Sequence, residues 1–397
     1  NVVAIVLTHS GQASHCAILA RALEIPAVMG TPNIFDALSG GEVDVVDGSK
    51  GEVHLGLSPN KLVGWERNRK QFVRLRDSLR EFVGRSTRTA DGVPLQLEAN
   101  VGSEADVLRA GEYGLDGVGL FRTEFMFQSR DYFPTEEEQF QVYQRMALAL
   151  QGKPLTIRTL DAGGDKPLPY LTRSPEENPE LGCRGVRFCL EEVGMFRTQL
   201  RAVLRAGAYG NIRMMVPLVT SLAEVRRVKE LLEECRMELK REGLPYGERI
   251  PLGVMIETPS ATILADLLAK EADFFSIGTN DLTQYTMAAD RKNPAVAGYY
   301  SHYDPAVLRA VGRITRAGGE AGIPVAVCGE AAADPLYLPV LLAMGVRELS
   351  VLPVALLAAR KAVSKWTLAD AQAVTRQALE LDTESQVRAW LEDHKRL

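Results

Sequence analysis

The 397-residue sequence predicts an α/β protein in which a (β/α)8 TIM barrel follows a small, partial α/β domain and a linker helix. Three patterns predict this fold class. Short runs rich in β-branched residues alternate with helical patterns eight times over residues 87–366. A charged helical stretch precedes this repeat, and a shorter mixture of strands and one helix opens the chain.

Each of the eight predicted barrel strands is followed by a candidate helix. The strands are Leu95–Asn100, Gly117–Phe121, Leu155–Thr159, Arg213–Leu218, Leu252–Ile256, Phe274–Ile277, Val325–Cys328 and Glu348–Leu352. The clearest helices are Glu104–Tyr113, Thr135–Leu150, Ser221–Arg241, Ala261–Ala269, Pro305–Ala321 and Pro335–Met344. A doubly wound open sheet is the alternative, but the number of units favours the barrel. Both folds bind ligands at the carboxyl ends of their strands.

The segments outside the barrel are shorter. Residues 1–58 predict strands at Val2–Leu7, Pro26–Met29, Val43–Val46 and Val53–Leu57, a helix at Ser14–Leu23 and a turn at Asp47-Gly48. Residues 59–86 read as the linker helix, whose pattern covers Pro59–Val83. Residues 367–397 predict a helical tail that supports packing or dimerisation. Because the chain opens at Asn1, without Met and directly in a strand, we expect further sequence upstream.

The composition excludes several classes of protein. A net charge of −5 and a pI near 5.8 give no electrostatic footprint for nucleic acid or for an anionic membrane surface. No apolar run of 18 residues and no signal-peptide pattern are present, so we expect a soluble cytoplasmic protein. The five cysteines are scattered without CxxC spacing and predict reduced thiols.

Polar residues gather where the predicted strands end. The set comprises Asn100, Arg122, Arg158, Glu257, Asn280, Asp281 and Cys328. Active sites of TIM barrels form at this rim, and arginine bonds phosphate or carboxylate with two donors at once. Arg184 and Arg291 stand on loops that could close over the same rim. Any one arginine also fits an ordinary surface position, but their common placement favours a small phosphorylated carboxylate as ligand.

Two carboxylates at neighbouring strand ends suit a metal ion. Glu257 and Asp281 would give Mg²⁺ two hard oxygen ligands, with phosphate and water supplying others, and Asn280 would add a neutral contact. Helix capping is the alternative for both carboxylates. The Cys328 thiol at the rim could hand over a proton, although a cysteine at a strand end is more often buried and inert.

His15 stands at the predicted start of the helix in the small domain. A phosphate on its imidazole would be stabilised by the free backbone N–H groups and the positive end of the helix dipole. A capping or packing histidine is the alternative, and on chemistry alone His9 has an equal claim.

Taken together, these residues resemble the enzyme I family of phosphoenolpyruvate–protein phosphotransferases. The match runs across nearly the whole chain, in the segments ASHCAILARALEIPAVMG, GVGLFRTEFMF, PTEEEQF, IRTLDAGGDKPLPY, ENPELGCRGVRF, MIETPSA, FFSIGTNDLTQYTMAADR and CGEAAADP. The resemblance implies a swivelling phosphohistidine domain, a helical linker and a phosphoenolpyruvate-binding barrel that dimerises.

The resemblance also implies residue roles. His15, which follows Ser14 in the family's pattern, would be the phosphorylated histidine, whereas His9 does not match. Arg122, Arg158, Arg184, Asn280 and Arg291 would bind substrate, Asp281 would join them as a ligand of Mg²⁺ together with Glu257, and Cys328 would be the proton donor. Phosphate would pass from phosphoenolpyruvate to His15, with release of pyruvate, and then to the carrier protein HPr as the first step of sugar uptake.

The sequence departs from the family pattern at the histidine motif. Gln12-Ala13 stands where the family commonly has Arg-Thr, which points to a specialised branch such as the enzyme I module of a multiphosphoryl transfer protein. The helical subdomain that binds HPr precedes the active histidine in this family and is not within these residues. The alternatives are a fragment of a pyruvate phosphate dikinase or phosphoenolpyruvate synthase, a nitrogen-regulatory phosphotransferase, and a relay module without turnover.

Overall fold

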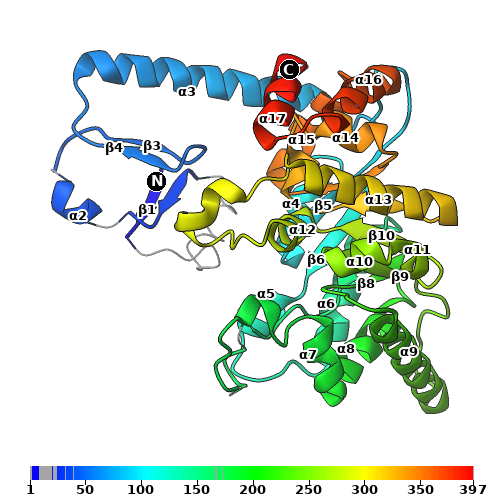
Figure 1. The fold of residues 1–397 in the computed structure, drawn as a ribbon. Helices are drawn as coiled ribbons and strands as arrows, with labels where there is room; N and C mark the ends of the chain where they lie inside the picture. Colours follow the sequence, from blue (N-terminus) through cyan, green and yellow to red (C-terminus); the bar gives the residue numbers. More distant parts are fainter. Residues whose placement is uncertain are drawn as a thin grey trace. The chain divides into compact units, whose positions relative to one another are not determined.

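The chain folds into two compact units, Asn1–Glu81 and Phe82–Leu397. The computed structural model describes residues 2–8, 20, 25–31, 33–38, 40–164, 166, 168–171 and 173–396. Figure 1 colours the chain in sequence order, from the blue strands of the first unit to the red helices at the C-terminus. In the described part of the chain, no helix is long and apolar enough to cross a membrane.

Short strands and one long helix make up the first unit. Strand β1 (Ile5–Leu7) pairs in parallel with β2 (Ala27–Met29), and β3 (Val45–Asp47) pairs antiparallel with β4 (Glu52–His54). Helix α2 (Ile34–Ala37) follows β2. The predicted helix Ser14–Leu23 lies outside the described residues, apart from Ala20. The linker forms α3 (Pro59–Leu79) and a single turn, η1 (Arg80–Phe82), with proline in the first helical turn where its missing N–H costs nothing.

The second unit is a closed barrel of eight parallel strands, which confirms the TIM barrel and excludes the open sheet. The strands are β5 (Gln96–Val101), β6 (Gly117–Arg122), β7 (Leu155–Arg158), β8 (Ile212–Val216), β9 (Leu252–Ile256), β10 (Phe274–Ile277), β11 (Val325–Val327) and β12 (Glu348–Val351). They pair in sequence order, and the pairing of β12 with β5 closes the ring. Predicted and observed strand ends differ by at most two residues.

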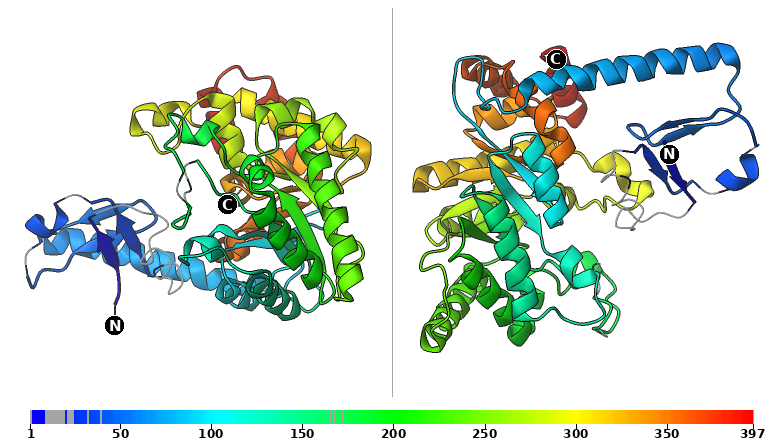
Figure 2. Two further views of the ribbon diagram at one scale, coloured as in Figure 1. Left: turned by 90° about the horizontal axis from the view of Figure 1, so that it is seen from below. Right: turned by 180° about the vertical axis from the view of Figure 1, so that it is seen from behind.

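Helices surround the strands, as both views in Figure 2 show. They are α4 (Glu104–Glu112), α5 (Glu124–Gln128), α6 (Glu136–Ala149), α7 (Val186–Glu191), α8 (Val193–Ala206), α9 (Leu222–Glu242), α10 (Pro259–Ile263), α11 (Ala265–Leu268), α12 (Thr279–Met287), α13 (Pro305–Ala321), α14 (Leu338–Ala343), α15 (Leu356–Val363), α16 (Leu368–Leu379) and α17 (Glu384–Asp393). Short 3-10 helices are η2 (Pro179–Leu181), η3 (Pro294–Tyr299), η4 (Glu330–Ala333) and η5 (Pro353–Ala355). The predicted helix Ala261–Ala269 is broken at Leu264, and α16 packs on α14 and on α17.

Side chains of each strand alternate between the helical layer and the barrel interior. Outward residues such as Leu97, Ile157 and Val254 belong to the large apolar core shared with the helices. A second, smaller apolar cluster comprises Leu120, Met215, Met255, Phe274 and Cys328. The barrel interior is therefore filled by side chains and is not a pore.

One carboxyl group is buried inside the barrel, on the amino-terminal half of β5. Glu98 on β5 is 1% exposed, and its Oε1 is buried without a hydrogen-bond partner in the described structure. Burial, and then the nearby Glu348, raise its pKa to about 8, although Arg213 opposes this shift. The space beside Glu98 is tight, because a Cβ added at Gly119 would lie 2.5 Å from its Oε2. We conclude that Glu98 is held in its protonated form at neutral pH.

Arg360 on α15 joins the end of the barrel to its beginning. This residue is 2% exposed, and its guanidinium donates to the carbonyl oxygens of Phe82 at 2.7 Å, Tyr113 at 3.0 Å and Gly114 at 2.5 Å. Its Nε also donates to the Thr87 hydroxyl at 3.1 Å. One side chain thus satisfies carbonyl groups that precede β5 and β6, some 250 residues away in sequence.

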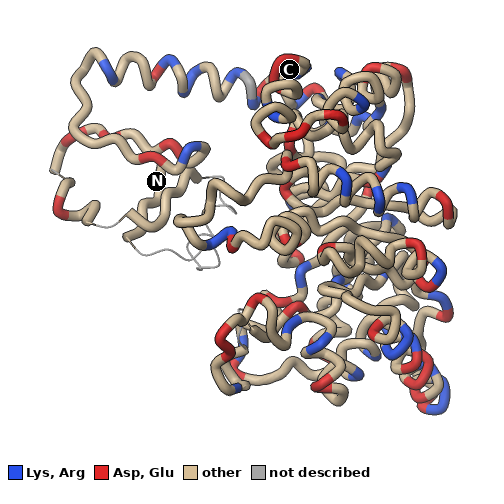
Figure 3. The backbone as a smooth tube through the Cα atoms, in the orientation of Figure 1, with Lys and Arg blue, Asp and Glu red and all other residues tan. Residues whose placement is uncertain are grey.

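Three helices on one side of the barrel share a network of ion pairs. Arg201 on α8 lies 2.6 Å from Glu136 on α6 and 2.5 Å from Glu242 on α9. Arg205 reaches the other oxygen of Glu136 at 2.8 Å. Figure 3 shows acidic and basic residues side by side along α9. The network links α6, α8 and α9, which pack side by side in that order.

Candidate active site

The structure places the predicted residues of the barrel rim at or just beyond the carboxyl ends of the strands. Arg122 and Arg158 are the last residues of β6 and β7, and they are paired in register. Glu257 directly follows β9, and Cys328 directly follows β11. Asn280 and Asp281 lie in the first turn of α12, just after β10. Together with Asn100 near the end of β5, six of the eight strands therefore contribute to one face of the barrel.

Arg158 is held by carboxylates inside this rim. It is 6% exposed, and its Nη2 donates to Glu124 at the start of α5 and lies 3.3 Å from Asp161 Oδ2. Its Nη1 lies 3.8 Å from the sulfur of Met255. Its Nε is buried and, among the described residues, has no hydrogen-bond partner. The guanidinium is thus fixed in place while one buried donor stays available to a ligand.

Asp161 is a centre of charge that the sequence analysis did not identify. It is 1% exposed, and it binds Lys166 together with the guanidinium groups of Arg158 and Arg184. Burial alone would raise its pKa, but Lys166, Arg184 and Arg158 outweigh burial and hold the pKa well below its usual range. The segment IRTLDAGGDK contains this aspartate three residues after Arg158, which was the available signal.

Arg184 lies in the loop between η2 and α7, in keeping with the loop position expected from the sequence. The side chain is fully buried, and its Nη2 donates to both oxygens of Asp161 at 3.2 Å. Its Nη1 donates to Glu180 at 2.7 Å and lies 3.4 Å from the Tyr285 hydroxyl. The same Nη2 is 3.9 Å from Asp281 Oδ2. Arg184 therefore contributes positive charge to the rim from a fully buried position.

Glu257 and Asp281 form a pair of buried carboxylates. Glu257 is 1% exposed, and its Oε1 accepts the backbone N–H of Leu218 at 2.7 Å. Burial, and then the charges of Asp281 and Asp161, raise the pKa of Glu257 to about 8, although Arg158 and Arg184 oppose the shift. Within the described residues, Asp281 Oδ1 is buried without a hydrogen bond. Two repelling carboxylates, one of them with a buried oxygen that accepts no hydrogen bond, fit a divalent cation.

Arg291 and Asn280 complete the same edge. Arg291 Nη1 lies 3.5 Å from Asp281 Oδ1, and its side chain is 26% exposed. Asn280 Oδ1 accepts the backbone N–H of Glu330 at 2.9 Å, which ties α12 to the turn that follows Cys328. Arg122 is half-buried and lies near enough to Cys328 to act on its pKa. Each of these residues borders the carboxylate pair or the thiol.

The Cys328 thiol is 3% exposed and stays protonated at neutral pH. Burial is the main cause that raises its pKa to about 11, and the charge of Glu257 adds to it. The neighbouring Ser276 hydroxyl and the charges of Arg158 and Arg122 act in the opposite direction. A thiol of this kind is a poor nucleophile but retains a proton that it can donate.

Asn100, another rim residue, is engaged inside the barrel wall. Its Nδ2 donates to the carbonyl oxygens of Cys328 at 2.9 Å and Ser350 at 3.1 Å, and its Oδ1 accepts the Ser350 hydroxyl at 2.7 Å. These bonds join β5, β11 and β12 and fix the backbone of Cys328. The predicted phosphorylation site, His15, lies outside the described residues.

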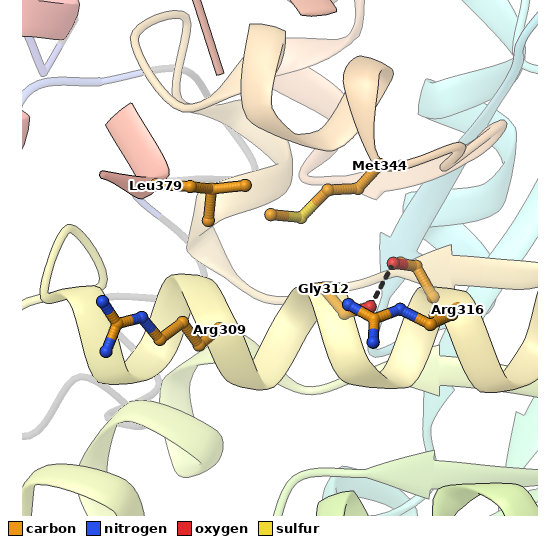
Figure 4. A pocket seen from close by; sticks show the side chains of 6 residues that line it. Arg309, Gly312, Arg316, Met344 and Leu379 are labelled. Carbon is orange, nitrogen blue, oxygen red and sulfur yellow. Dashed lines mark hydrogen bonds between the residues drawn. The ribbon is translucent and has the colours of Figure 1, made fainter. Parts of the chain in front are cut away.

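A separate hollow of about 450 Å³ lies on the second unit, away from the rim. It is lined by Arg309, Gly312, Thr315 and Arg316 of α13, with Met344 and Leu379 opposite them (Figure 4). None of the rim residues lines it. The charge pairs described above identify the rim, not this hollow, as the candidate active site.

Comparison with known proteins identifies the family of the chain. Residues 76–368 match the family described as PEP-utilising enzyme, PEP-binding domain, and residues 1–51 match PEP-utilising enzyme, mobile domain. A solved citrate lyase of Burkholderia xenovorans aligns over 75% of this chain and 89% of its own, with a TM-score of 0.44 at 16% identity, and is too remote to bear on function.

Curated relatives are much more similar. The phosphoenolpyruvate-protein phosphotransferase of Geobacillus stearothermophilus is 45% identical over 95% of this chain and 65% of its own length. Those of Staphylococcus carnosus and Bacillus subtilis are 42% and 41% identical over 97% and 96% of this chain, and 67% of their own. The chain spans about 65% of the length of the first of these relatives. It therefore belongs to the family of phosphoenolpyruvate-utilising enzymes that contains the phosphoenolpyruvate–protein phosphotransferases.

Proposed function

We propose that this chain transfers the phosphoryl group of phosphoenolpyruvate to its own His15, releases pyruvate, and passes the phosphoryl group to a histidine of the carrier protein HPr. This would be the first step of the sugar phosphotransferase system, in the cytoplasm. The observation that carries the proposal is the meeting of arginines, two repelling carboxylates and a protonated thiol at one barrel rim. The names of the relatives support the same reaction.

The proposed division of labour follows the matched families. Residues 1–58 would be the C-terminal part of the swivelling phosphohistidine domain, and 59–86 the linker helix. Residues 87–366 would be the phosphoenolpyruvate-binding barrel, through which two copies would dimerise, and 367–397 the helical tail. The two family matches, over 1–51 and 76–368, support this order.

The rim suits a substrate that bears both a phosphate and a carboxylate. Arg122, Arg158 and Arg291 would neutralise these groups by charge-assisted hydrogen bonds, and Asn280 would add a neutral contact. Arg184 would act on the substrate and on Asp281 through its positive charge, from its buried position. Fixed positive groups at this point stabilise the charge that the transferring phosphoryl group spreads over its oxygens.

Glu257 and Asp281 would hold Mg²⁺. The two carboxylates fit because Asp281 Oδ1 has no hydrogen bond within the described residues and because the charge of Asp281 raises the pKa of Glu257. Among the described residues no cluster of three or more histidine, cysteine, aspartate or glutamate side chains could hold a metal, so substrate and water would supply the other ligands. When bound, the cation would neutralise phosphate oxygens and the developing enolate.

The proposed reaction uses the imidazole of His15, the thiol of Cys328 and water. An imidazole nitrogen of His15 forms the N–P bond while the bond from phosphorus to the enol oxygen breaks. The electron pair of that bond leaves with the enolate of pyruvate. The Cys328 thiol then gives its proton to the methylene carbon of the enolate, which yields pyruvate, and the thiolate recovers a proton from water.

A phosphorylation experiment tests the proposal. The chain is incubated with phosphoenolpyruvate and Mg²⁺, acid-labile phosphate is mapped by mass spectrometry, and pyruvate release is followed in parallel. We expect phosphate on His15 with an equal amount of pyruvate, and neither with His15→Ala. Phosphate on another residue, or labelling by ATP in place of phosphoenolpyruvate, would contradict the proposal.

A further inference from the structure

Glu180 links two loops of the candidate active site. It stands in η2, in the loop between β7 and α7, and its side chain is 20% exposed. Its Oε2 accepts Arg184 Nη1 at 2.7 Å, and its Oε1 accepts Lys292 Nζ at 2.8 Å. Its carbonyl oxygen accepts the Tyr285 hydroxyl on α12 at 2.5 Å. One residue of the third barrel loop is thus bonded to the helix and the loop that follow β10.

The two ion pairs of Glu180 differ in their surroundings. Arg184 is fully buried, so breaking its pair with Glu180 leaves a buried charge with one partner fewer. Lys292 is 54% exposed, and a pair of this kind contributes little to stability and weakens in salt. The Arg184 side is therefore a permanent part of the fold, whereas the Lys292 side is able to open and close.

Both partners of Glu180 adjoin residues that the proposed function uses. Lys292 directly follows Arg291, whose guanidinium lies 3.5 Å from Asp281 Oδ1. Arg184 lies 3.9 Å from the other oxygen of Asp281. Glu180 is thus connected to Asp281 through Arg184 on one side, and through Lys292 and its neighbour Arg291 on the other.

We propose that Glu180 is a positioning residue and that its pair with Lys292 is a latch that holds the 290–300 loop against the β7 loop. The latch sets Arg291 in the place where it meets the substrate before the substrate arrives. This inference rests on the proposed function for its kinetic consequence. Its structural consequence, an ordered 290–300 loop, does not depend on catalysis.

Hydrogen exchange in the ligand-free chain tests the structural part. We expect Lys292→Gln and Glu180→Gln to speed backbone exchange in η3 (Pro294–Tyr299) by about threefold, because each removes the latch. Lys292→Arg keeps the charge and should restore slow exchange. Glu177→Gln, an exposed glutamate of the same loop, serves as the matched control and should leave exchange unchanged. Equal exchange in all four variants would overturn the latch.

Kinetics test the functional part. We expect Lys292→Gln to raise KM for phosphoenolpyruvate about fivefold with kcat within twofold of the native value, and the difference in KM to vanish in 0.5 M salt. In the double variant Glu180→Gln/Lys292→Gln, KM should rise less than the product of the single effects. A fall in kcat at constant KM would overturn the positioning role. If Lys292→Gln and Glu180→Gln speed exchange in η3 as expected but the native chain shows no turnover, the latch stands and the proposed function fails.

Discussion

The buried Glu98 predicts a pH-dependent stability that one substitution removes. Glutamine has almost the shape of a protonated glutamate, so Glu98→Gln keeps the packing around Gly119 but cannot ionise. The folded state holds the proton of Glu98 up to a pH of about 8, whereas the unfolded chain releases it near 4.5. Between these values the native protein loses stability as pH rises, because the unfolded state binds fewer protons.

The size of the effect follows from the two pKa values. At 1.36 kcal/mol per pKa unit, the difference between 4.5 and about 8 corresponds to a ceiling of about 5 kcal/mol. Water penetration and local relaxation lower this figure, so we expect the variant to exceed the native protein by about 2–4 kcal/mol at pH 9. At pH 5 the two proteins should have nearly equal free energies of unfolding. The gain should grow between these pH values and level off above pH 8.

Urea unfolding at half-unit steps from pH 5 to pH 9 measures the difference directly. Other titrating groups are common to both proteins and cancel in the comparison. Glu112→Gln, at the exposed end of α4, is the control and should follow the native profile. Parallel stability curves for the native protein and Glu98→Gln would refute the reasoning, since they would mean that Glu98 ionises inside the barrel at no cost.

Three further predictions concern the thiol, the carboxylate pair and the helix network. Cys328→Ala should lower pyruvate release by about 10²–10⁴ while calorimetry finds phosphoenolpyruvate binding within threefold of native. The affinity for Mn²⁺, measured by electron paramagnetic resonance, should rise about tenfold per pH unit up to about pH 8 and then level off, because the cation displaces the proton of Glu257. The Glu257→Gln variant should bind Mn²⁺ more weakly and without this pH dependence. Arg201→Met should cost about 1 kcal/mol in urea unfolding, and less in 1 M salt, whereas Arg227→Met, on an exposed pair, should cause no measurable change.

Strand positions were predictable because most of the strands carry two signals at once. In β9, Leu252, Val254 and Ile256 face the helices and give the β-rich pattern, and the polar residue that ends the strand marks the rim. The polar residue at each strand end then predicted Arg122, Arg158, Glu257 and Cys328 at one face. A TIM barrel guarantees that such ends meet, so local pattern and fold together sufficed.

Residues whose meaning depends on partners far along the chain were not predictable. In the sequence Asp161 shortly precedes two glycines, which is typical of a turn. Only the folded loop brings Arg184, 23 positions further along the chain, into contact with it. For the same reason the sequence placed Arg184 on a loop but carried no sign that its side chain is fully buried. The predicted segment Ala261–Ala269 contains no glycine or proline that would mark the break at Leu264, so its periodicity predicted one helix in place of α10 and α11.

Arg360 also has a consequence for how the protein is made. Its side chain and the pairing of β12 with β5 bind the beginning of the barrel to residues that leave the ribosome some 250 positions later. Until then β5 has no partner on one edge, and the carbonyl groups of Tyr113 and Gly114 lack their donor. For most of its synthesis the nascent barrel is thus not closed, and it exposes an unpaired strand edge to which other chains can bind. Chaperones that shield strand edges are expected to bind it in that interval and to leave once Arg360 emerges.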